Sequence, residues 1–159
     1  MARNEMHQRI RVKFEIQRFS CDPSEITAAL DLKPTQTWLK GDDTMPYLNR
    51  KKDHNWKGAK YNYWGIESGV SSSEDVETHL HALIKKIHPK LAQIQSLDST
   101  YHKRIWISAH YYTDNNPGLS LESQLLQELA ELKIDMDMES WCPNLSDKDA
   151  DEYMKKTEY

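Results

Sequence analysis

Histidines are the first side chains in this sequence that could do chemistry, as metal ligands. His79, His81 and His88 fall within one predicted helix. At about 100° per residue, His79 and His81 point to opposite sides of that helix, while His81 and His88 lie two turns apart. No two of them have the i, i+4 spacing of a chelating pair, and no HExxH motif occurs. We therefore expect no metal site, and we interpret these histidines as residues of a solvated helix.

Carboxylates form the second candidate group. Asp135, Asp137 and Glu139 alternate along the last predicted strand, so they share one face. Successive residues on one face of a strand are roughly 7 Å apart, which suits acid–base chemistry or the binding of a basic partner. A solvated sheet face has the same pattern, and we favour that interpretation. The sequence has no GxSxG, P-loop or GxGxxG motif, so it indicates no catalytic residue and no cofactor.

The segment from Tyr47 to Trp64 mixes cationic and aromatic side chains. Its cations are Arg50, Lys51, Lys52, Lys57 and Lys60, and its aromatics are Tyr47, Trp56, Tyr61, Tyr63 and Trp64. Such a mixture can bind single-stranded nucleic acid by stacking and charge, or it can form a protein-binding loop with aromatic anchors. An ordinary hairpin insertion with tryptophans packed on a sheet would look the same. We weigh the insertion first, protein binding second and nucleic acid third.

Composition limits the classes of protein further. The chain has 159 residues, 38% of them hydrophobic and 29% charged, and a net charge of −4. The negative charge argues against a general nucleic-acid or membrane binder. We find no apolar run of membrane-spanning length and no secretory signal in the N-terminal residues, so we expect a cytoplasmic protein. Cys21 and Cys142 show no CxxC spacing, and we expect both to be reduced.

Periodic patterns predict the elements that would position these side chains. Ile10, Val12, Phe14 and Ile16 alternate with polar residues as in a half-buried strand. A helix follows, with Asp22 as its cap, Pro23 at its first position and Glu25 completing a capping box, and Ile26, Ala29 and Leu30 form its inner face. The other predicted elements are strands at 35–41, 61–68, 104–112 and 134–139, a long helix from Glu74 with a kink at Pro89, and a helix capped by Ser120. Either face of the 104–112 strand could be the buried one.

This order predicts an α+β fold. The first six elements match a ferredoxin-like βαββαβ unit, and a further helix and strand extend it. One mixed sheet with the helices on one face would bury the apolar stripes of those helices. We expect a single domain over residues 1–142, interrupted by a polar hairpin insertion at 43–60, and an acidic tail at 143–159. The residues expected to lie buried under the helices are Val76, Leu83, Ile87, Leu125 and Leu129.

Four separated blocks carry a resemblance to a known family. They are "DPSEITAALDLKPTQTWLKGD", "YWGIES", "SEDVETHLHALIKKIHPK" and "NPGLSLESQLLQELAELKIDMDMES". Together they resemble the bacterial domain-of-unknown-function family DUF4279 over roughly residues 10–140. The resemblance implies a small stand-alone cytosolic domain but no reaction. Some similar small acidic domains are immunity proteins of bacterial toxin systems, which here is an analogy.

The last part of the first block, "PTQTWLKGD" (residues 34–42), supplies the candidate site. Trp38, Lys40 and Asp42 fall at the end of a short strand, and Gly41 permits a turn. We expect both Trp38 and Trp64 to be buried and to meet near the sheet end. The candidate binding residues are Trp38, Lys40, Asp42, Trp56, Trp64 and Glu67.

Taken together, these features favour a non-enzymatic protein that recognises another protein, with toxin neutralisation as one form of that role. The alternative is a small-ligand-binding or enzymatic domain whose pocket lies near Trp38 and Trp64. A third reading is nucleic-acid binding through the basic aromatic loop at 50–60. The oligomeric state stays open.

Overall fold

The computed structural model describes residues 8–44, 57–111 and 118–142 of the chain. Its elements in order are β1 Gln8–Gln17, α1 Pro23–Leu30, β2 Gln36–Trp38, β3 Tyr63–Glu67, α2 Val76–Ile87, the short 3₁₀ helix η2 His88–Lys90, α3 Leu91–Ser96, β4 His102–Tyr111, α4 Ser123–Leu132 and β5 Asp135–Trp141. The predicted order of strands and helices is confirmed. Most of the 43–60 insertion and the whole 143–159 tail lie outside the described residues.

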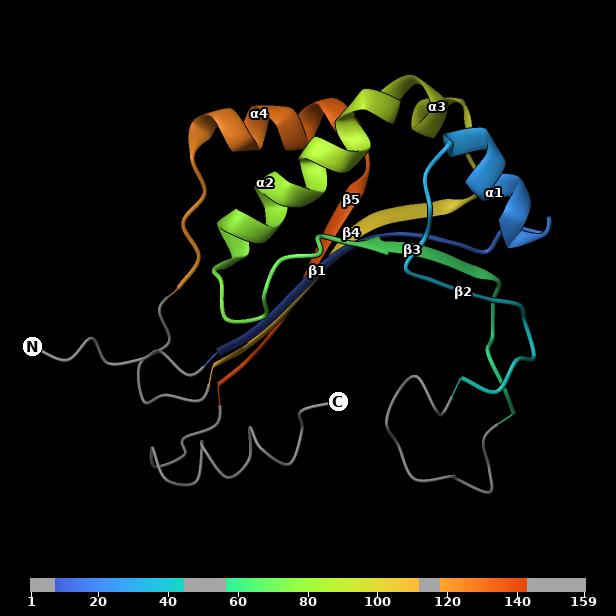
Figure 1. The fold of residues 1–159 in the computed structure, drawn as a ribbon, viewed down its shortest axis with the longest axis horizontal. Coiled ribbons are helices and arrows are strands. Elements are labelled where there is room, and N and C mark those ends of the chain that lie inside the picture. Colours follow the sequence, from blue (N-terminus) through green and yellow to red (C-terminus); the bar gives the residue numbers. More distant parts are fainter. Residues whose placement is uncertain (1–7, 45–56, 112–117, 143–159) are drawn as a thin grey trace, which may run out of the picture.

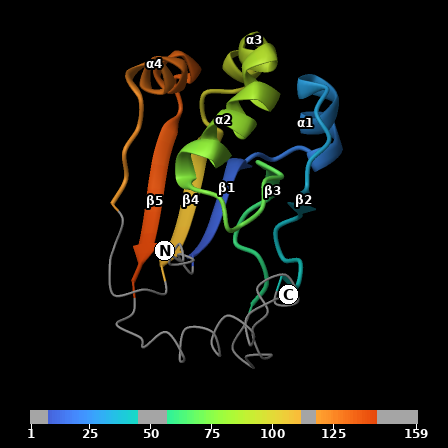
Figure 2. The same cartoon turned by 60° about the vertical axis from the view of Figure 1, so that its left-hand side comes forward.

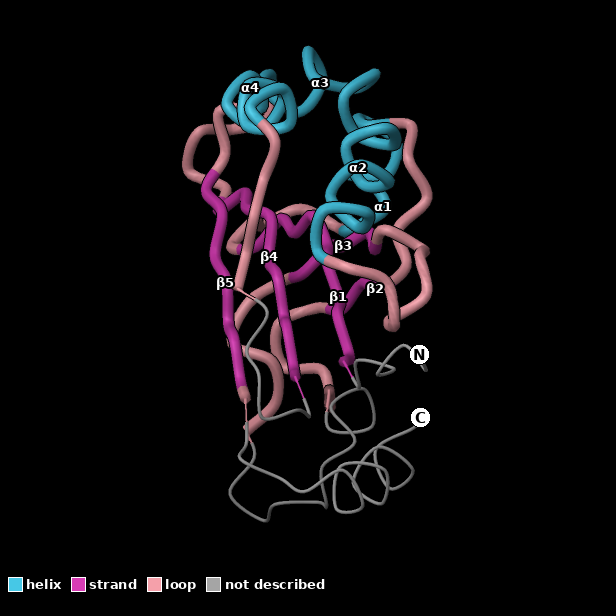
Figure 3. Tube along the Cα trace, turned by 90° about the vertical axis from the view of Figure 1, so that its left-hand side faces the viewer, coloured by secondary structure: helices cyan, strands magenta, loops and turns pink. Residues whose placement is uncertain are grey.

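All five strands join one mixed sheet, as the sequence predicts. Their spatial order is β2-β3-β1-β4-β5. β1 pairs antiparallel with both β3 and β4, and β2 pairs antiparallel with β3, whereas β5 pairs parallel with β4. The helices lie on one side of the sheet (Figure 1), and the views in Figures 2 and 3 show β5, β4 and β1 side by side beneath them. We call the side under the helices the inner face and the other side the outer face.

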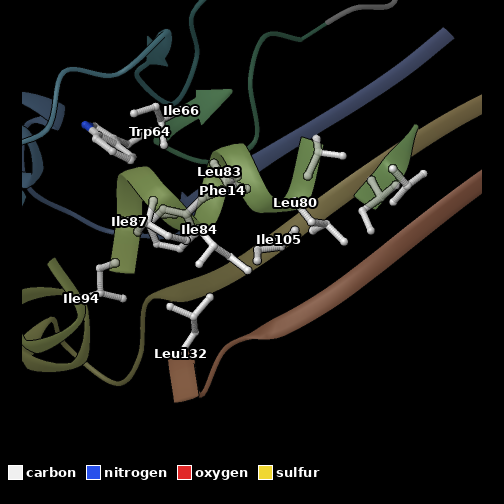
Figure 4. Packing of buried hydrophobic residues seen from close by; sticks show 14 of the residues in the cluster. Phe14, Trp64, Ile66, Leu80, Leu83, Ile84, Ile87, Ile94, Ile105 and Leu132 are labelled. Carbon is white, nitrogen blue, oxygen red and sulfur yellow. The ribbon is translucent and has the colours of Figure 1, made fainter. Parts of the chain in front are cut away.

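The core forms between the inner face and the helices because β1 alternates as predicted. Ile10, Val12, Phe14 and Ile16 are all buried. On β4 the inner face is the one that carries Ile105 and Ile107, which settles the choice that the sequence left open. Figure 4 shows Phe14, Leu83, Ile87 and Ile105 packed together, with Trp64 and Ile66 of β3 beside them.

The capping prediction for α1 is confirmed in detail. The Asp22 side chain accepts a hydrogen bond from the Ser24 amide, the Glu25 side chain accepts one from the Asp22 amide, and Pro23 begins the helix. Ile26 and Leu30 are buried, but the expectation for Ala29 is wrong because Ala29 is exposed. Thr27 turns toward the sheet in its place, where its hydroxyl meets the Trp64 indole.

The long amphipathic segment folds as two helices instead of the one kinked helix that the sequence predicted, although the break falls at the expected proline. α2 begins at Val76 behind an Asp75 cap, two residues later than expected. The 3₁₀ turn at Pro89 then redirects the chain into α3, because proline has no N–H to continue the α-helical ladder. The apolar stripe survives the turn, and Val76, Leu83, Ile87 and Ile94 are buried.

The C-terminal helix and strand differ more from expectation. α4 begins at Ser123 behind Glu122, so the predicted Ser120 cap is wrong. Leu125 and Leu132 are buried, whereas Leu129 is only half-buried. Every residue of β5 is exposed. The alternation that predicted β5 is real, but the strand lies at the sheet edge, where no described element covers either of its faces.

Candidate functional site on the outer face

The two tryptophans of the predicted site do not meet, which corrects the sequence interpretation. In the β2–β3 pairing, Thr37 lies opposite Trp64 and Trp38 lies opposite Tyr63. Residues directly opposite each other share a face, so a difference of one position places the two indoles on opposite faces of the sheet. Trp38 is half-buried on the outer face, and Trp64 is completely buried on the inner face.

Trp64 has a structural role in this arrangement. Its ring packs edge-on against Phe14, with 6.2 Å between ring centroids. Its Nε1–H donates to the Thr27 hydroxyl over 2.9 Å, so the one polar atom of the indole is satisfied inside the core. A fully buried and fully paired indole is a core residue, and it presents no surface to a ligand.

Lys40 and Asp42 belong to a turn. The Asp42 side chain accepts the Leu39 amide at 2.7 Å, and the Asp42 amide donates to the Leu39 carbonyl at 3.1 Å. Gly41 has a φ of 93°, and its amide donates to Ala59 while the Ala59 amide donates to Asp42. Backbone hydrogen bonds therefore connect the "KGD" turn to Ala59, which follows residues 45–56 in the chain. The side chains of Lys40 and Asp42 are exposed, and the predicted binding residue Trp56 lies outside the described parts.

The outer face carries a second aromatic arrangement, built on a glycine. The Trp38 and Tyr63 rings stack with 3.9 Å between centroids and 10° between planes. Tyr63 then lies flat across Gly65, where a Cβ would come within 2.8 Å of the ring carbon Cζ. Since Gly65 is the β1 partner of Glu15, this path brings the Tyr63 hydroxyl to the Glu15 carboxylate over 3.0 Å. The missing side chain of Gly65 thus creates the space for the tyrosine.

Glu15 is the centre of this face. It is only 2% exposed, and its oxygens accept from Lys13 Nζ at 2.7 Å, Arg104 Nε at 2.9 Å and the Tyr63 hydroxyl. Burial alone would raise the pKa of Glu15, but the charges and hydrogen bonds of Lys13 and Arg104 outweigh it and hold that pKa below its ordinary value. Burial, together with the Glu15 carboxylate, raises the pKa of Tyr63 far above its ordinary value. The pair therefore stays as carboxylate and phenol.

The contacts continue to both sides of Glu15. Arg104 also donates from Nη1 to Asp137 at 2.7 Å, which reaches β5. Lys13 Nζ lies 4.6 Å from the centre of the Trp106 ring and 5.4 Å from that of Tyr63, within cation–π range of both. We call this connected set the outer-face network; its members are Trp38, Tyr63, Lys13, Glu15, Arg104, Trp106 and Asp137. It crosses all five strands.

Glu67, the remaining predicted site residue, is also on the outer face but outside the network. It is half-buried and forms an ion pair with Arg11. It lies at the end of β3 away from Tyr63, about four residues along the strand, which is roughly 13 Å. The sequence-predicted residues therefore do not converge on one pocket in the described structure.

Hollows near Trp38 are small or open. A cavity of about 170 Å³ lies against Trp38 and Tyr63, lined also by Gln17, Thr44 and Ala59. An open hollow of about 370 Å³ lies beside Trp38, next to Thr37 and Asp42. A larger groove of about 920 Å³ lies between α2 and α4, lined by charged and polar side chains such as Lys85 and Glu128.

Comparison with known proteins gives a family and no function. The family model described as "Domain of unknown function (DUF4279)" matches residues 8–143. The chain belongs to the DUF4279 family. The resemblance inferred from the four sequence blocks is thereby confirmed. Searches of the curated proteins and of the solved structures found no match for this DUF4279 protein. Among its described helices, none has the length and apolar character needed to cross a membrane.

One set of potential metal ligands in this DUF4279 domain escaped the sequence interpretation. Glu77 and His81 are four residues apart on α2, and the residue before α4 adds Glu122. Their donor atoms lie within 4.8 Å of one another. Glu77 and His81 are 3.8 Å apart, and the Glu122 amide donates to Glu77. Only the spacing between histidines entered the sequence interpretation, and so the i, i+4 pair of Glu77 and His81 was overlooked. Exposed groups of this kind are common on surfaces without a metal.

A buried histidine forms the other polar cluster of interest. His79 is 2% exposed, with Nδ1 2.6 Å from the Ser68 hydroxyl and Nε2 3.0 Å from the Ser71 carbonyl. Since the carbonyl can only accept, Nε2 carries the proton and Nδ1 accepts from Ser68. Burial lowers the pKa of His79, and the contact with Ser71 and the nearby carboxylates, chiefly Asp75, oppose that shift in part. The histidine predicted to be solvated is instead a neutral core residue that holds the 68–75 loop.

Sequence reasoning missed the centre of the outer-face network. Lys13 and Glu15 were assigned to the polar side of a strand, which is correct, but an alternating pattern does not show which polar residues are buried. The available signal was Gly65 in the middle of an aromatic strand, since a glycine there often marks a close approach by a neighbouring group.

Proposed function

We propose that this DUF4279 domain is a non-enzymatic protein-recognition module that binds its partner through the outer face of the sheet. The observation that carries the proposal is the outer-face network: aromatic rings and charged groups held in fixed positions across five strands, on the side that no described helix covers. Trp106 and Arg104 are half-buried members of it, and the Arg104 side chain is 23% exposed. Tryptophan, tyrosine and arginine in fixed positions are the residues that dominate protein interfaces.

The alternative of an enzyme has less support from this face. A general acid or base needs a pKa near the working pH and a free position for the substrate proton. The carboxylate of Glu15 already accepts hydrogen bonds from four side chains, those of Lys13, Gln17, Tyr63 and Arg104. The pKa of Glu15 is lowered, while that of Tyr63 is raised. Both groups would therefore keep their protonation states through the neutral range, which suits a rigid contact surface.

The small-ligand and nucleic-acid alternatives also have less support. Ligand pockets usually measure about 300–1,000 Å³ and enclose most of the ligand. The cavity against Trp38 has about 170 Å³, and the hollow of about 370 Å³ beside Trp38 is open to solvent. On β5 the outer face ends in Asp135, Asp137 and Glu139, which would repel a phosphate backbone. The basic part of the 50–60 loop, on which the nucleic-acid alternative rests, lies outside the described residues apart from Lys57 and Lys60.

Three finer statements belong to the same proposal. We propose that β1 to β4, with the intervening helices, form a ferredoxin-like unit; the support is their antiparallel order β2-β3-β1-β4. We propose that the protein acts in the bacterial cytoplasm, which is consistent with the free thiol of Cys21. We also propose toxin neutralisation as the form of recognition. The net charge of −4 would suit a basic toxin, and a toxin gene next to this one would support the idea.

Site-specific photo-crosslinking in the native cell tests the proposed contact face. A photoreactive phenylalanine replaces Gln36, a half-buried β2 residue next to Trp38 on the outer face, or, as a control, the exposed Gln127 of α4. We expect one defined adduct from position 36 and none from position 127. Adding Trp106→Ala should reduce the yield roughly tenfold or more, as expected for an interface hot spot. An adduct from position 127 alone, or none from either position, would refute the proposal.

A further inference from the structure

β5 is a long strand at the margin of the sheet with one pairing partner. It spans seven residues, pairs parallel with β4 and has no second neighbour among the described strands. All seven residues are exposed, and no described strand pairs with the backbone edge of β5 that points away from β4. The opposite margin is different, because β2 has only three residues. A long exposed edge offers a row of backbone donors and acceptors to an added strand, whereas a short one does not.

The side chains of β5 differ sharply between its two faces. Met136 and Met138 lie opposite Ile105 and Ile107, so they are on the inner face, yet they remain 44% and 39% exposed. Asp135, Asp137 and Glu139 are on the outer face, and the Asp135 side chain is 77% exposed. The edge therefore combines partly exposed, adaptable methionine side chains on one side with a row of negative charge on the other.

The row of carboxylates determines which kind of strand could pair with the free edge of β5. If a second copy paired through β5, the carboxylates of the two strands would face each other on the same side, about 4.5–5.5 Å apart, which is destabilising. A strand that alternates basic with apolar residues would instead place its cations beside Asp135 and Glu139 and its apolar side chains against the methionines. Charge complementarity thus disfavours self-association and favours a basic extended segment.

We infer that β5 accepts an extended segment of a partner protein, with alternating basic and apolar residues, as a sixth strand of the sheet. The inference rests on the proposed protein-recognition function and names the chemistry of its partner. Main-chain hydrogen bonds along the β5 edge provide affinity in this mode of recognition, and the alternating side chains provide specificity. Asp137 contributes less than its neighbours because its carboxylate already accepts from Arg104.

A synthetic peptide probe tests the inference on the full chain. The probe has about eight residues of alternating lysine and valine, and its control is the same peptide with alternate backbone amides N-methylated, which keeps the charge but removes hydrogen-bond donors. We expect the unmodified peptide to bind and to protect β5 amides from hydrogen exchange. The N-methylated peptide should bind at least about tenfold more weakly, since charge alone remains. Equal binding of the two peptides, protection confined to other elements, or no binding would overturn the inference.

Two matched double variants separate the β5 charges from the overall charge of the protein. The Asp135→Asn/Glu139→Gln variant removes two carboxylates from β5 and leaves the Arg104–Asp137 contact intact. The Glu74→Gln/Glu128→Gln variant removes the same charge on the helix side. We expect the first to weaken peptide binding by about five- to tenfold, and the second to change it by less than about twofold. Equal effects of the two variants would show non-specific attraction and refute the inference.

Sedimentation and crosslinking provide the remaining outcomes. A dimer that is lost when Met138 is replaced by proline would show that a second copy occupies the edge, which would also overturn the inference. If the peptide fails while position 36 still gives its partner adduct, only the β5 inference fails and the proposed function stands. If the peptide binds at β5 and position 36 gives no adduct, the outer face is wrong as the contact surface and the edge-strand site remains.

Discussion

Replacing Gly65 with alanine should destabilise the protein through the outer-face network. The new Cβ would lie 2.8 Å from Cζ and 2.9 Å from Cε1 of Tyr63, closer than such atoms approach in proteins. Gly65 itself is in an extended strand, so backbone strain is not the cause. The Tyr63 ring cannot shift freely, because Trp38 stacks on it and its hydroxyl donates a hydrogen bond to Glu15.

The size of the effect follows from the contacts that the displaced ring would lose. A hydrogen bond to a charged group contributes about 1.5–3 kcal/mol, and an aromatic pair contributes about 0.5–1.5 kcal/mol. The alanine would return roughly 0.4–1 kcal/mol by restricting the unfolded chain. The net loss in free energy of unfolding is then about 1–4 kcal/mol, which for a domain of this size lowers the melting temperature by roughly 2–16 °C.

Thermal and urea denaturation of a double-mutant cycle measures this effect. Tyr63→Ala removes the ring, so Gly65→Ala should cost almost nothing further in that background. The coupling free energy between the two positions should therefore approach the full cost of Gly65→Ala. Tyr63→Phe is a milder comparison, because it removes only the hydroxyl. A Gly65→Ala protein that melts within about 1 °C of wild type, or one that loses the same stability with and without the Tyr63 ring, would refute the reasoning.

Four other predictions concern three single residues and the metal content of the protein. The folded-state pKa of His79 is lowered from 6.5, so its contribution to stability is complete above about pH 6.5 and is lost as the pH falls below that value, where the unfolded chain takes up the proton first. Urea denaturation between pH 5 and 8 should show this loss in wild type and a smaller loss in His79→Gln, where His110, whose pKa is also lowered by burial, still contributes. Thr27→Val should cost about 1–3 kcal/mol, because the buried Trp64 Nε1–H loses its acceptor; a neutral result in fluorescence-detected unfolding would contradict the assigned hydrogen bond. Lys40→Ala should cost less than about 1 kcal/mol in thermal denaturation, as surface changes usually do, and ready unfolding would give its side chain a structural role. A chelator should leave the melting temperature unchanged, and elemental analysis that finds about one zinc per chain would contradict this expectation.

The general form of the fold could be predicted because its signals are local. The Asp22–Pro23–Glu25 cap depends on neighbours within one turn, and the alternation from Ile10 to Ile16 depends on one strand. The 3₁₀ turn at Pro89 likewise follows from one residue. Exposure on β5 could not be predicted in the same way, since it depends on where the strand lies in the sheet. Met136 alternates just as Ile105 does, but only Ile105 has helices above it.

The candidate site was harder to predict, because it depends on register. Moving β2 by one residue against β3 would place Trp38 opposite Trp64 and let the two indoles meet, as the sequence interpretation expected. Both registers look equally reasonable in the sequence. The register in the structure puts Trp38 opposite Tyr63 and so creates the outer-face stack. The burial of Glu15 also depends on three other strands, which supply Tyr63, Arg104 and, through Arg104, Asp137. No single stretch of sequence carries that information.

The single parallel pairing of β5 has a consequence for the lifetime of the protein. If β5 and α4 detached together, β2, β3, β1 and β4 would keep every pairing they make with one another. The opening would expose Leu125 and Leu132 and the β4 edge, but it would leave the rest of the core in place. Such partial opening costs less free energy than global unfolding. Proteases that act on partly opened chains would therefore begin at this end of the molecule, and the strength of the β4–β5 pairing would set how quickly the cell replaces it.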